Sequence, residues 1–219
     1  MSDVKKKHLP WWQETLLMVA FALLLSILLK TFLVQAFYIP SESMQPTLNP
    51  DDKILVQKVS YWRGDPERGD VIVFKDSAGW LGDIEPQGAR GAVSKALQTV
   101  GLMPSGGHLV KRVIGVGGDT VSCCDEQGRM VVNGVSIEEP YLNEPEAAFG
   151  PNFTVKVPEG YLWVQGDNRN NSGDSRAHMG EAGGGFIPVE QVVGKTWMRM
   201  WPLSEVGTSP QTRAFQGVK

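Results

Sequence analysis

The sequence predicts a mainly β protein: an antiparallel β-sheet domain with a small β subdomain, preceded by one N-terminal transmembrane helix. Residues 15–29 contain no charged residue, which indicates an apolar helix. After residue 39 the apolar residues fall into short runs rich in β-branched and aromatic side chains, separated by turn residues. Because these runs follow one another without alternating helices, an antiparallel sheet is favoured over an α/β fold.

The predicted helix covers residues 12–36 and follows the basic run Lys5-Lys6-Lys7. A bilayer core needs about 20 apolar residues as helix, and this segment is long enough if Lys30 extends to the outer interface. Basic residues before the helix predict that residues 1–11 are cytoplasmic and that the rest lies outside a single-pass cell membrane anchor. A cleavable secretory signal is disfavoured because its apolar stretch is shorter and ends in a small-x-small site.

Seven strand-like runs follow, at residues 53–59, 71–75, 108–116, 129–137, 153–157, 161–165 and 192–200. Asn133-Gly134 between valines predicts a hairpin. We place these runs in an extracytoplasmic domain of residues 37–203, with an insertion at 76–107 and a small subdomain at about 120–160. The insertion includes a helix-like stretch at 89–100. Residues 204–219 are polar and are expected to be a flexible tail.

Bulk composition excludes some functions. The net charge of -3 and the absence of a basic stripe argue against nucleic acid as a partner. Cys123 and Cys124 are adjacent, which is no metal-site spacing; they pair with each other, pair with another chain, or have no special role. No metal or cofactor is expected.

The segment after the predicted anchor is the first candidate for chemistry. It reads PSESMQPT at residues 40–47, with prolines on both sides of Ser43. Prolines fix the backbone angle φ, so they hold a short loop stiffly. Such pre-organisation suits a nucleophile, although serine and proline are also common in ordinary linkers.

A serine nucleophile needs a base to accept its proton. His8 lies on the predicted cytoplasmic side, and His108 and His178 lack the G-x-S-x-G context of a hydrolase triad. Lys111 lies in the strand-like run LVKRVIGV, where alternation places it on one face with Leu109 and Val113. Burial disfavours the ammonium form and lowers the pKa of lysine, so an amine on this face becomes a base near neutral pH. The alternative is a solvent-facing lysine on an edge strand.

A third segment, at residues 166–176, is dense in polar side chains and follows the strand-like run YLWVQ. Asp174 and Arg176 are placed to form an ion pair, and Ser172 to orient a lysine. The same composition also suits a surface loop.

In this order, the three segments and the anchor resemble the bacterial type I signal peptidase family. The matching runs are P-S-x-S-M-x-P-T at 40–47, K-R-V-x-G-x-x-G-D at 111–119 and G-D-N-R-x-N-S-x-D-S-R at 166–176. The resemblance implies a membrane-bound serine endopeptidase that removes signal peptides from precursor proteins. It also implies that Ser43 is the nucleophile, that Lys111 is the general base, and that the Ser41 hydroxyl and the Ser43 amide form the oxyanion hole.

The resemblance implies supporting roles as well. Ser172 would orient the lysine, Asp174 and Arg176 would form a structural ion pair, and Met44 would pack beside the nucleophile. The chain departs from the family pattern at Glu42, a position that is often glycine, and at Asn170, which replaces a frequent aspartate. The 76–107 insertion is longer than in compact members.

Two other functions remain open from sequence. Self-cleaving SOS repressors share a Ser-Lys core, but they need a DNA-binding helix-turn-helix and lack an apolar anchor. A membrane-tethered β domain that binds a partner without chemistry is the second alternative.

Overall fold

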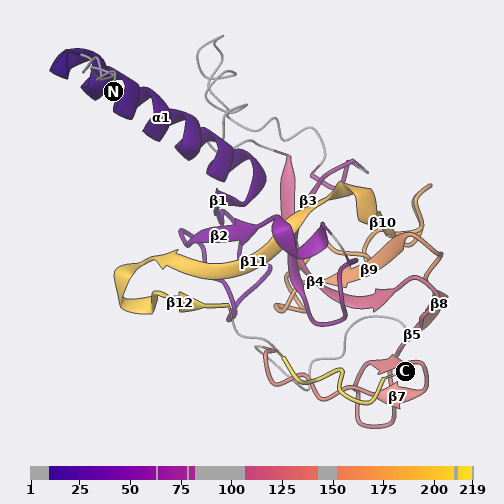
Figure 1. Cartoon of the computed structure of the whole chain (residues 1–219). Coiled ribbons are helices and arrows are strands. Elements are labelled where there is room, and N and C mark those ends of the chain that lie inside the picture. Colours follow the sequence, from indigo (N-terminus) through magenta and orange to yellow (C-terminus); the bar gives the residue numbers. More distant parts are fainter. Residues whose placement is uncertain are drawn as a thin grey trace.

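The computed structural model describes residues 10–62, 64–77, 79–81, 107–142, 152–209 and 212–218, except for the side chains of residues 28–31. It shows one long helix projecting from a body of antiparallel strands (Figure 1). The prediction of a mainly β, antiparallel fold is confirmed. The predicted helical stretch at 89–100, most of the insertion and the lysine run at 5–7 lie outside the described residues.

Within the described residues, eight strands form the larger sheet, in the order β1-β2-β11-β3-β4-β9-β10 with β12 added to β11. Their bounds are Val34–Tyr38 (β1), Lys53–Gln57 (β2), Val71–Lys75 (β3), His108–Val116 (β4), Tyr161–Gln165 (β9), Ile187–Pro188 (β10), Val192–Trp201 (β11) and Gly207–Thr208 (β12). Short 3-10 helices lie at Val59–Tyr61 (η1), Val189–Gln191 (η2) and Leu203–Glu205 (η3). Each strand pair is antiparallel.

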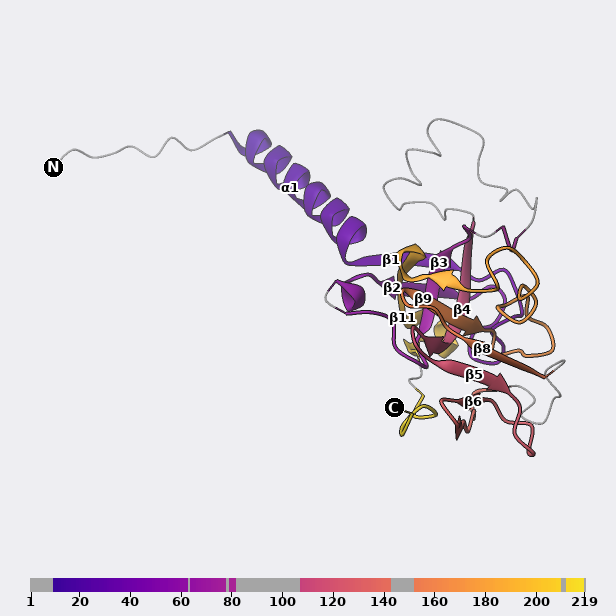
Figure 2. The same cartoon turned by 90° about the vertical axis from the view of Figure 1, so that its right-hand side faces the viewer.

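The smaller sheet has the order β7-β6-β5-β8. Its strands are Thr120–Cys123 (β5), Val131–Val132 (β6), Val135–Ser136 (β7) and Phe153–Lys156 (β8). Asn133 and Gly134 form the turn between β6 and β7, both with positive φ, as an Asn-Gly hairpin requires. This sheet lies at the end of the body away from the helix (Figure 2). A disulfide joins the adjacent Cys123 and Cys124 at the end of β5.

Helix α1 (Trp11–Phe32) carries apolar side chains around its circumference and exposes many of them. Leu16, Met18, Phe21 and Leu23 are each at least 60% exposed. Both views show α1 extending away from the sheets (Figures 1 and 2). Within the residues that the structure describes, no helix combines the length and the apolar character needed to cross a membrane.

The helix ends four residues earlier than the sequence predicted. Residues from Val34 onward leave the helix and pair with β2, with Val34 opposite Gln57 and Tyr38 opposite Lys53. The largely apolar composition on both sides hid this boundary, because β-branched and aromatic residues suit both a membrane helix and a strand. The chain therefore enters the sheet directly from α1.

The last segment is more ordered than the flexible tail that the sequence predicted. Residues 207–208 pair with β11, and Phe215 packs against the apolar core beside the smaller sheet. Gly69 closely approaches Phe215, since a Cβ there would lie 3.1 Å from the ring. The 204–218 segment thus returns along the body of the domain.

Candidate active site

Ser43 and Lys111 lie together in the structure. Lys111 Nζ donates a hydrogen bond to Ser43 Oγ over 2.7 Å. Lys111 comes from the middle of β4, opposite Ile72 of β3, and Ser43 comes from the 40–47 loop that follows β1. Residues 68 positions apart in the sequence therefore form one buried pair, with Lys111 2% exposed and Ser43 8% exposed.

The surroundings of Lys111 are apolar on its own face of the sheet. Leu109 and Val113, two residues away on either side, pack against a cluster that contains Ile72 and Phe74. Burial lowers the pKa of Lys111 from 10.5 to about 8, against the smaller opposing effect of the carboxylates of Asp174 and Asp167. An amine with this pKa is partly neutral at pH 7 to 8, as a base for a hydroxyl must be.

The 40–47 loop is held by the loop that follows β9. The backbone N–H of Asn168 donates to the carbonyl of Ser43 over 3.1 Å, and its side chain donates to the carbonyl of Glu42 over 3.2 Å. Gly166 permits this close approach, because a Cβ at that position would lie 2.3 Å from the Ser43 carbonyl oxygen. Met44 is 1% exposed and packs with Ile39 and Leu48, which fixes the other side of the loop.

The two remaining serines differ in their contacts. Ser41 Oγ lies 3.2 Å from Ser43 Oγ, so its hydroxyl borders the same site. Ser172 Oγ is buried and would lie 2.3 Å from a Cβ at Gly166, so it lies in the same neighbourhood. Ser172 Oγ forms no hydrogen bond to Lys111 in this conformation; its hydroxyl instead neighbours the Asp174 carboxylate and helps to lower the pKa of that group.

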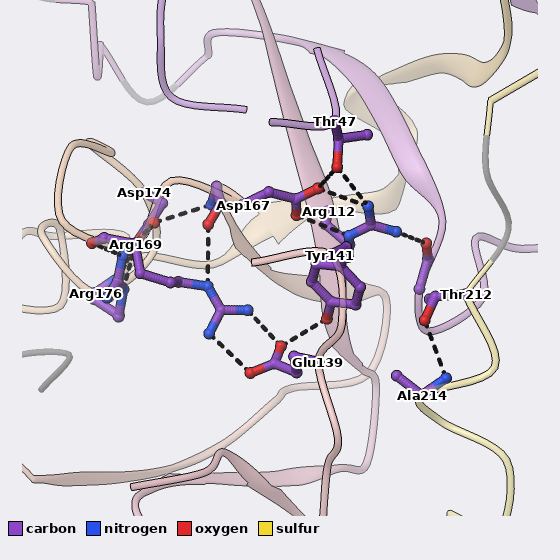
Figure 3. A network of polar contacts seen from close by, with 12 residues as sticks. Thr47, Arg112, Glu139, Tyr141, Asp167, Arg169, Asp174, Arg176, Thr212 and Ala214 are labelled. Carbon is purple, nitrogen blue, oxygen red and sulfur yellow. Dashed lines mark hydrogen bonds and ion pairs between the residues drawn. The ribbon is translucent and has the colours of Figure 1, made fainter. Parts of the chain in front are cut away.

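A buried ion pair links the two loops to the strand that bears Lys111 (Figure 3). Arg112 donates two hydrogen bonds to the Asp167 carboxylate, from Nε over 2.8 Å and from Nη2 over 2.6 Å. Its Nη1 donates to the carbonyl of Gly69. Thr47 Oγ1 donates to the same carboxylate over 2.5 Å. Although burial acts to lower the pKa of Arg112, the hydrogen bond and charge of Asp167 raise it. The 40–47 loop, β4 and the start of the 166–176 loop therefore meet on one carboxylate.

A second buried pair connects the site to the segment that follows β7 of the smaller sheet (Figure 3). Arg169 donates to both oxygens of Glu139, over 3.1 Å and 2.5 Å, and Tyr141 donates to Glu139 over 2.6 Å. The ring of Tyr141 lies under the Arg112 guanidinium at 3.9 Å from its centroid. These contacts hold the side chains of Arg169 and Arg112 in place.

Asp174 and Arg176 form an ion pair at 2.8 Å. Burial acts to raise the pKa of Asp174, but the bonds from the Arg176 guanidinium and the Gly166 N–H lower it below its usual value. The carboxylate therefore stays ionised and holds the 166–176 loop in shape.

Arg199 of β11 is a further support that the sequence did not single out. It donates to the carbonyl of Thr47 over 2.5 Å and forms an ion pair with Asp52 at 3.1 Å. Glu205 contacts the same guanidinium. The sequence around Arg199 gives no local signal of such a role, because its partners Thr47 and Asp52 come from distant segments.

Among the described residues, no group of three or more His, Cys, Asp or Glu is arranged to hold a metal ion. His178 instead stacks on Trp80, with 4.4 Å between ring centroids, and contacts Glu181 at 2.7 Å. What the described site brings together is a buried amine, a hydroxyl within proton-transfer distance and a second hydroxyl beside it.

Comparisons with known proteins show which family the chain belongs to. The family described as signal peptidase, peptidase S26, matches residues 12–201. A probable signal peptidase I from Mycobacterium leprae is 36% identical, over 99% of this chain and 85% of its own length. Signal peptidase I from Mycobacterium tuberculosis is 37% identical, over 94% of this chain and 78% of its own. A probable signal peptidase I-2 from Synechocystis is 37% identical, over 93% and 81%. The chain therefore belongs to the signal peptidase family, peptidase S26, and is a hydrolase of the serine endopeptidase class.

Proposed function

We propose that this protein removes N-terminal signal peptides from exported precursor proteins, with Ser43 as nucleophile and Lys111 as general base, while attached to the membrane. The observation that supports the dyad most strongly is the 2.7 Å separation between Lys111 Nζ and Ser43 Oγ in a buried setting. The signal peptidase I relatives support the choice of substrate.

Acylation follows from this geometry. Neutral Lys111 accepts the Ser43 proton as Oγ attacks the scissile carbonyl, and the carbonyl oxygen becomes an oxyanion. The Ser43 N–H and the Ser41 hydroxyl are the donors for that oxyanion, and Ser41 Oγ lies 3.2 Å from the attacking oxygen. When the peptide bond breaks, the protonated lysine gives its proton to the leaving amine, so the mature protein departs with a free N-terminus.

Deacylation uses the same groups in the same order. Lys111, neutral again, takes a proton from water, and the resulting hydroxide attacks the ester that joins the signal peptide to Ser43. Lys111 then returns the proton to Ser43 Oγ. Ser172 has the role of orienting the amine. Asp174, Arg176 and Met44 hold the loops in place.

Membrane attachment rests on α1 and on a second apolar surface. The exposed side chains of α1 would cost free energy in water, at roughly 25 cal/mol per Å² of apolar area. Four further apolar side chains near the C-terminal end of β11 are at least 44% exposed: Trp197 and Trp201 of β11, Leu203 of η3 and the following Val206. We place α1 in the cell membrane as a single crossing, with the N-terminus in the cytoplasm and the β domain outside.

The test is cleavage of a full-length exported precursor by the whole protein in detergent. Wild type should release a shortened product, and Ser43→Ala should reduce the rate by at least roughly 10³-fold, as loss of a nucleophile does. Lys111→Arg should be equally inactive, because a guanidinium is not deprotonated in proteins. Arg213→Lys, an exchange of one cation for another outside the site, is the matched control. No product from wild type would favour a binding domain without chemistry.

A further inference from the structure

Glu42 lies at the mouth of the candidate active site and is held there on two sides. It is exposed and directly precedes Ser43. Its carboxylate accepts a hydrogen bond from the side chain of Asn171 over 3.0 Å. Its backbone carbonyl accepts from the side chain of Asn168 over 3.2 Å and from the Gln45 N–H over 3.0 Å. The negative charge therefore has a defined position relative to Ser43.

No basic side chain among the described residues pairs with this charge. Among the described residues, Glu42 forms no ion pair, whereas the other charges of the site are paired internally. Arg112 is matched by Asp167 and Arg176 by Asp174, and the proposed base acts in its neutral form. Within the described part of the site, Glu42 thus contributes one unpaired negative charge next to Ser43 in the state that reacts.

A bound substrate must pass close to this carboxylate. Consecutive Cα atoms are about 3.8 Å apart, so the Glu42 carboxylate lies within roughly 10 Å of Ser43 Oγ. An extended substrate advances about 3.3 Å per residue, and the side chains next to the cleaved bond therefore come within about one Debye length of the charge. A lysine or arginine there reaches the carboxylate with its flexible stem.

We propose that Glu42, held in place by Asn171, is a specificity-determining residue. It selects precursors with a basic side chain close to the cleaved bond and disfavours precursors with an acidic one there. This inference rests on the proposed function, and it names a substrate class within it. Opposite charges in an exposed pair change rates by up to roughly five-fold, and like charges act in the reverse direction. The ratio of kcat/KM for a basic over an acidic substrate is therefore expected to reach about ten-fold.

A purely structural role for the Glu42–Asn171 contact predicts something different. If the contact only stiffens the 40–47 loop, its loss should slow the cleavage of every substrate equally. A charge effect should instead depend on substrate charge and on salt, because ions screen exposed charges.

The experiment uses matched precursors with a single lysine or glutamate next to the cleavage site. The changes are made at the second residue before the cleaved bond and at each of the first three after it, which leaves the small-x-small residues intact. For wild type, at least one position should give a lysine-to-glutamate ratio of about ten in kcat/KM. In Glu42→Gln the ratio at that position should fall toward one, in Glu42→Lys it should invert, and 0.5 M salt should reduce it in wild type.

Two further variants sharpen the result. Asn171→Ala keeps the charge of Glu42 but removes the hydrogen bond that holds its carboxylate in place. The lysine-to-glutamate ratio should therefore fall only part of the way toward one. Glu159→Gln removes an exposed carboxylate from the turn before β9 and should keep the wild-type ratio. A ratio near one at every position in wild type, or a loss of rate in Glu42→Gln that is equal for all substrates, would overturn the proposal. Failure of wild type to cut any precursor would instead refute the proposed function.

Discussion

Lys111 combines two demands that conflict in most lysines: it is almost fully buried, and it carries an ionisable amine. The apolar neighbours on its face of the sheet, Leu109 and Val113, remove water from the amine. The neutral form is therefore favoured, and the pKa falls to about 8. Arg112, the next residue, points the other way and stays charged because Asp167 matches it. Adjacent residues of one strand thus supply the proposed base and a structural cation.

The burial of Lys111 has a consequence for stability. Its pKa is about 8 in the folded protein and 10.5 when unperturbed, a difference worth roughly 3 kcal/mol. Below pH 8 the folded and unfolded chains are both protonated, and the folded state bears the whole cost of burying the charge. Between pH 8 and 10.5 the folded chain has lost the proton that the unfolded chain keeps, so stability rises with pH.

We therefore predict that Lys111→Met is more stable than wild type at pH 7, by roughly 1–3 kcal/mol. The advantage should shrink steadily as the pH approaches 10.5, because the wild-type amine becomes neutral in both states. Thermal unfolding of both proteins in the same detergent, at pH 7, 9 and 10.5, measures this difference. An advantage that does not change with pH would mean that the amine remains charged in the folded protein.

At the scale of elements, three segments define the site: the 40–47 loop, β4 and the 166–176 loop. β4 is the rigid member, since β3 and β9 pair with it on both sides. The other two are loops, and each is fixed by contacts to its neighbours, such as the bond from the Asn168 N–H to the Ser43 carbonyl. A loop held in this way positions a nucleophile as firmly as a strand would.

Helix α1 differs from these segments because most of its apolar side chains are exposed among the described residues. If it crosses the bilayer, the two ends of the chain are on opposite sides. We predict that in intact spheroplasts a membrane-impermeant thiol reagent labels Ser77→Cys, two residues after β3, but not Ser2→Cys. Both variants should resist extraction from membranes at pH 11.

Labelling after detergent lysis is the control, since both cysteines should then react. A helix that only lies on the membrane surface predicts a different pattern, with both positions labelled in intact cells. That pattern, or release of the protein at pH 11, would contradict a single crossing.

At the scale of the whole molecule, the sequence predicted the architecture better than its boundaries. Three strands, at 71–75, 108–116 and 161–165, match the structure to the residue, because turn residues bound each run. β1 was missed because it continues the apolar composition of the helix. β10 was missed because it is only two residues long and contains Pro188, a residue that argues against a strand.

In the candidate site, the sequence predicted the residues of local motifs but not the contacts between distant segments. Ser43, Lys111 and the Asp174–Arg176 pair were predicted, because their motifs are short and local in sequence. The contacts of Glu139 with Arg169 and of Arg199 with Thr47 join residues 30 and 152 positions apart. No periodicity or turn signal encodes such pairs, since they exist only once the two sheets have packed. The structure therefore adds mainly the long-range contacts that hold the loops of the site in place.

The central claim is that a buried, neutral Lys111 activates Ser43, and the pH dependence of acylation tests it most directly. The acylation rate is measured in single turnovers with a saturating precursor from pH 6 to 10. The account predicts a rate that rises about ten-fold per pH unit at low pH and levels off through a midpoint near 8. A rate that is flat over this range, or a midpoint near the 10.4 of a free lysine, would contradict it.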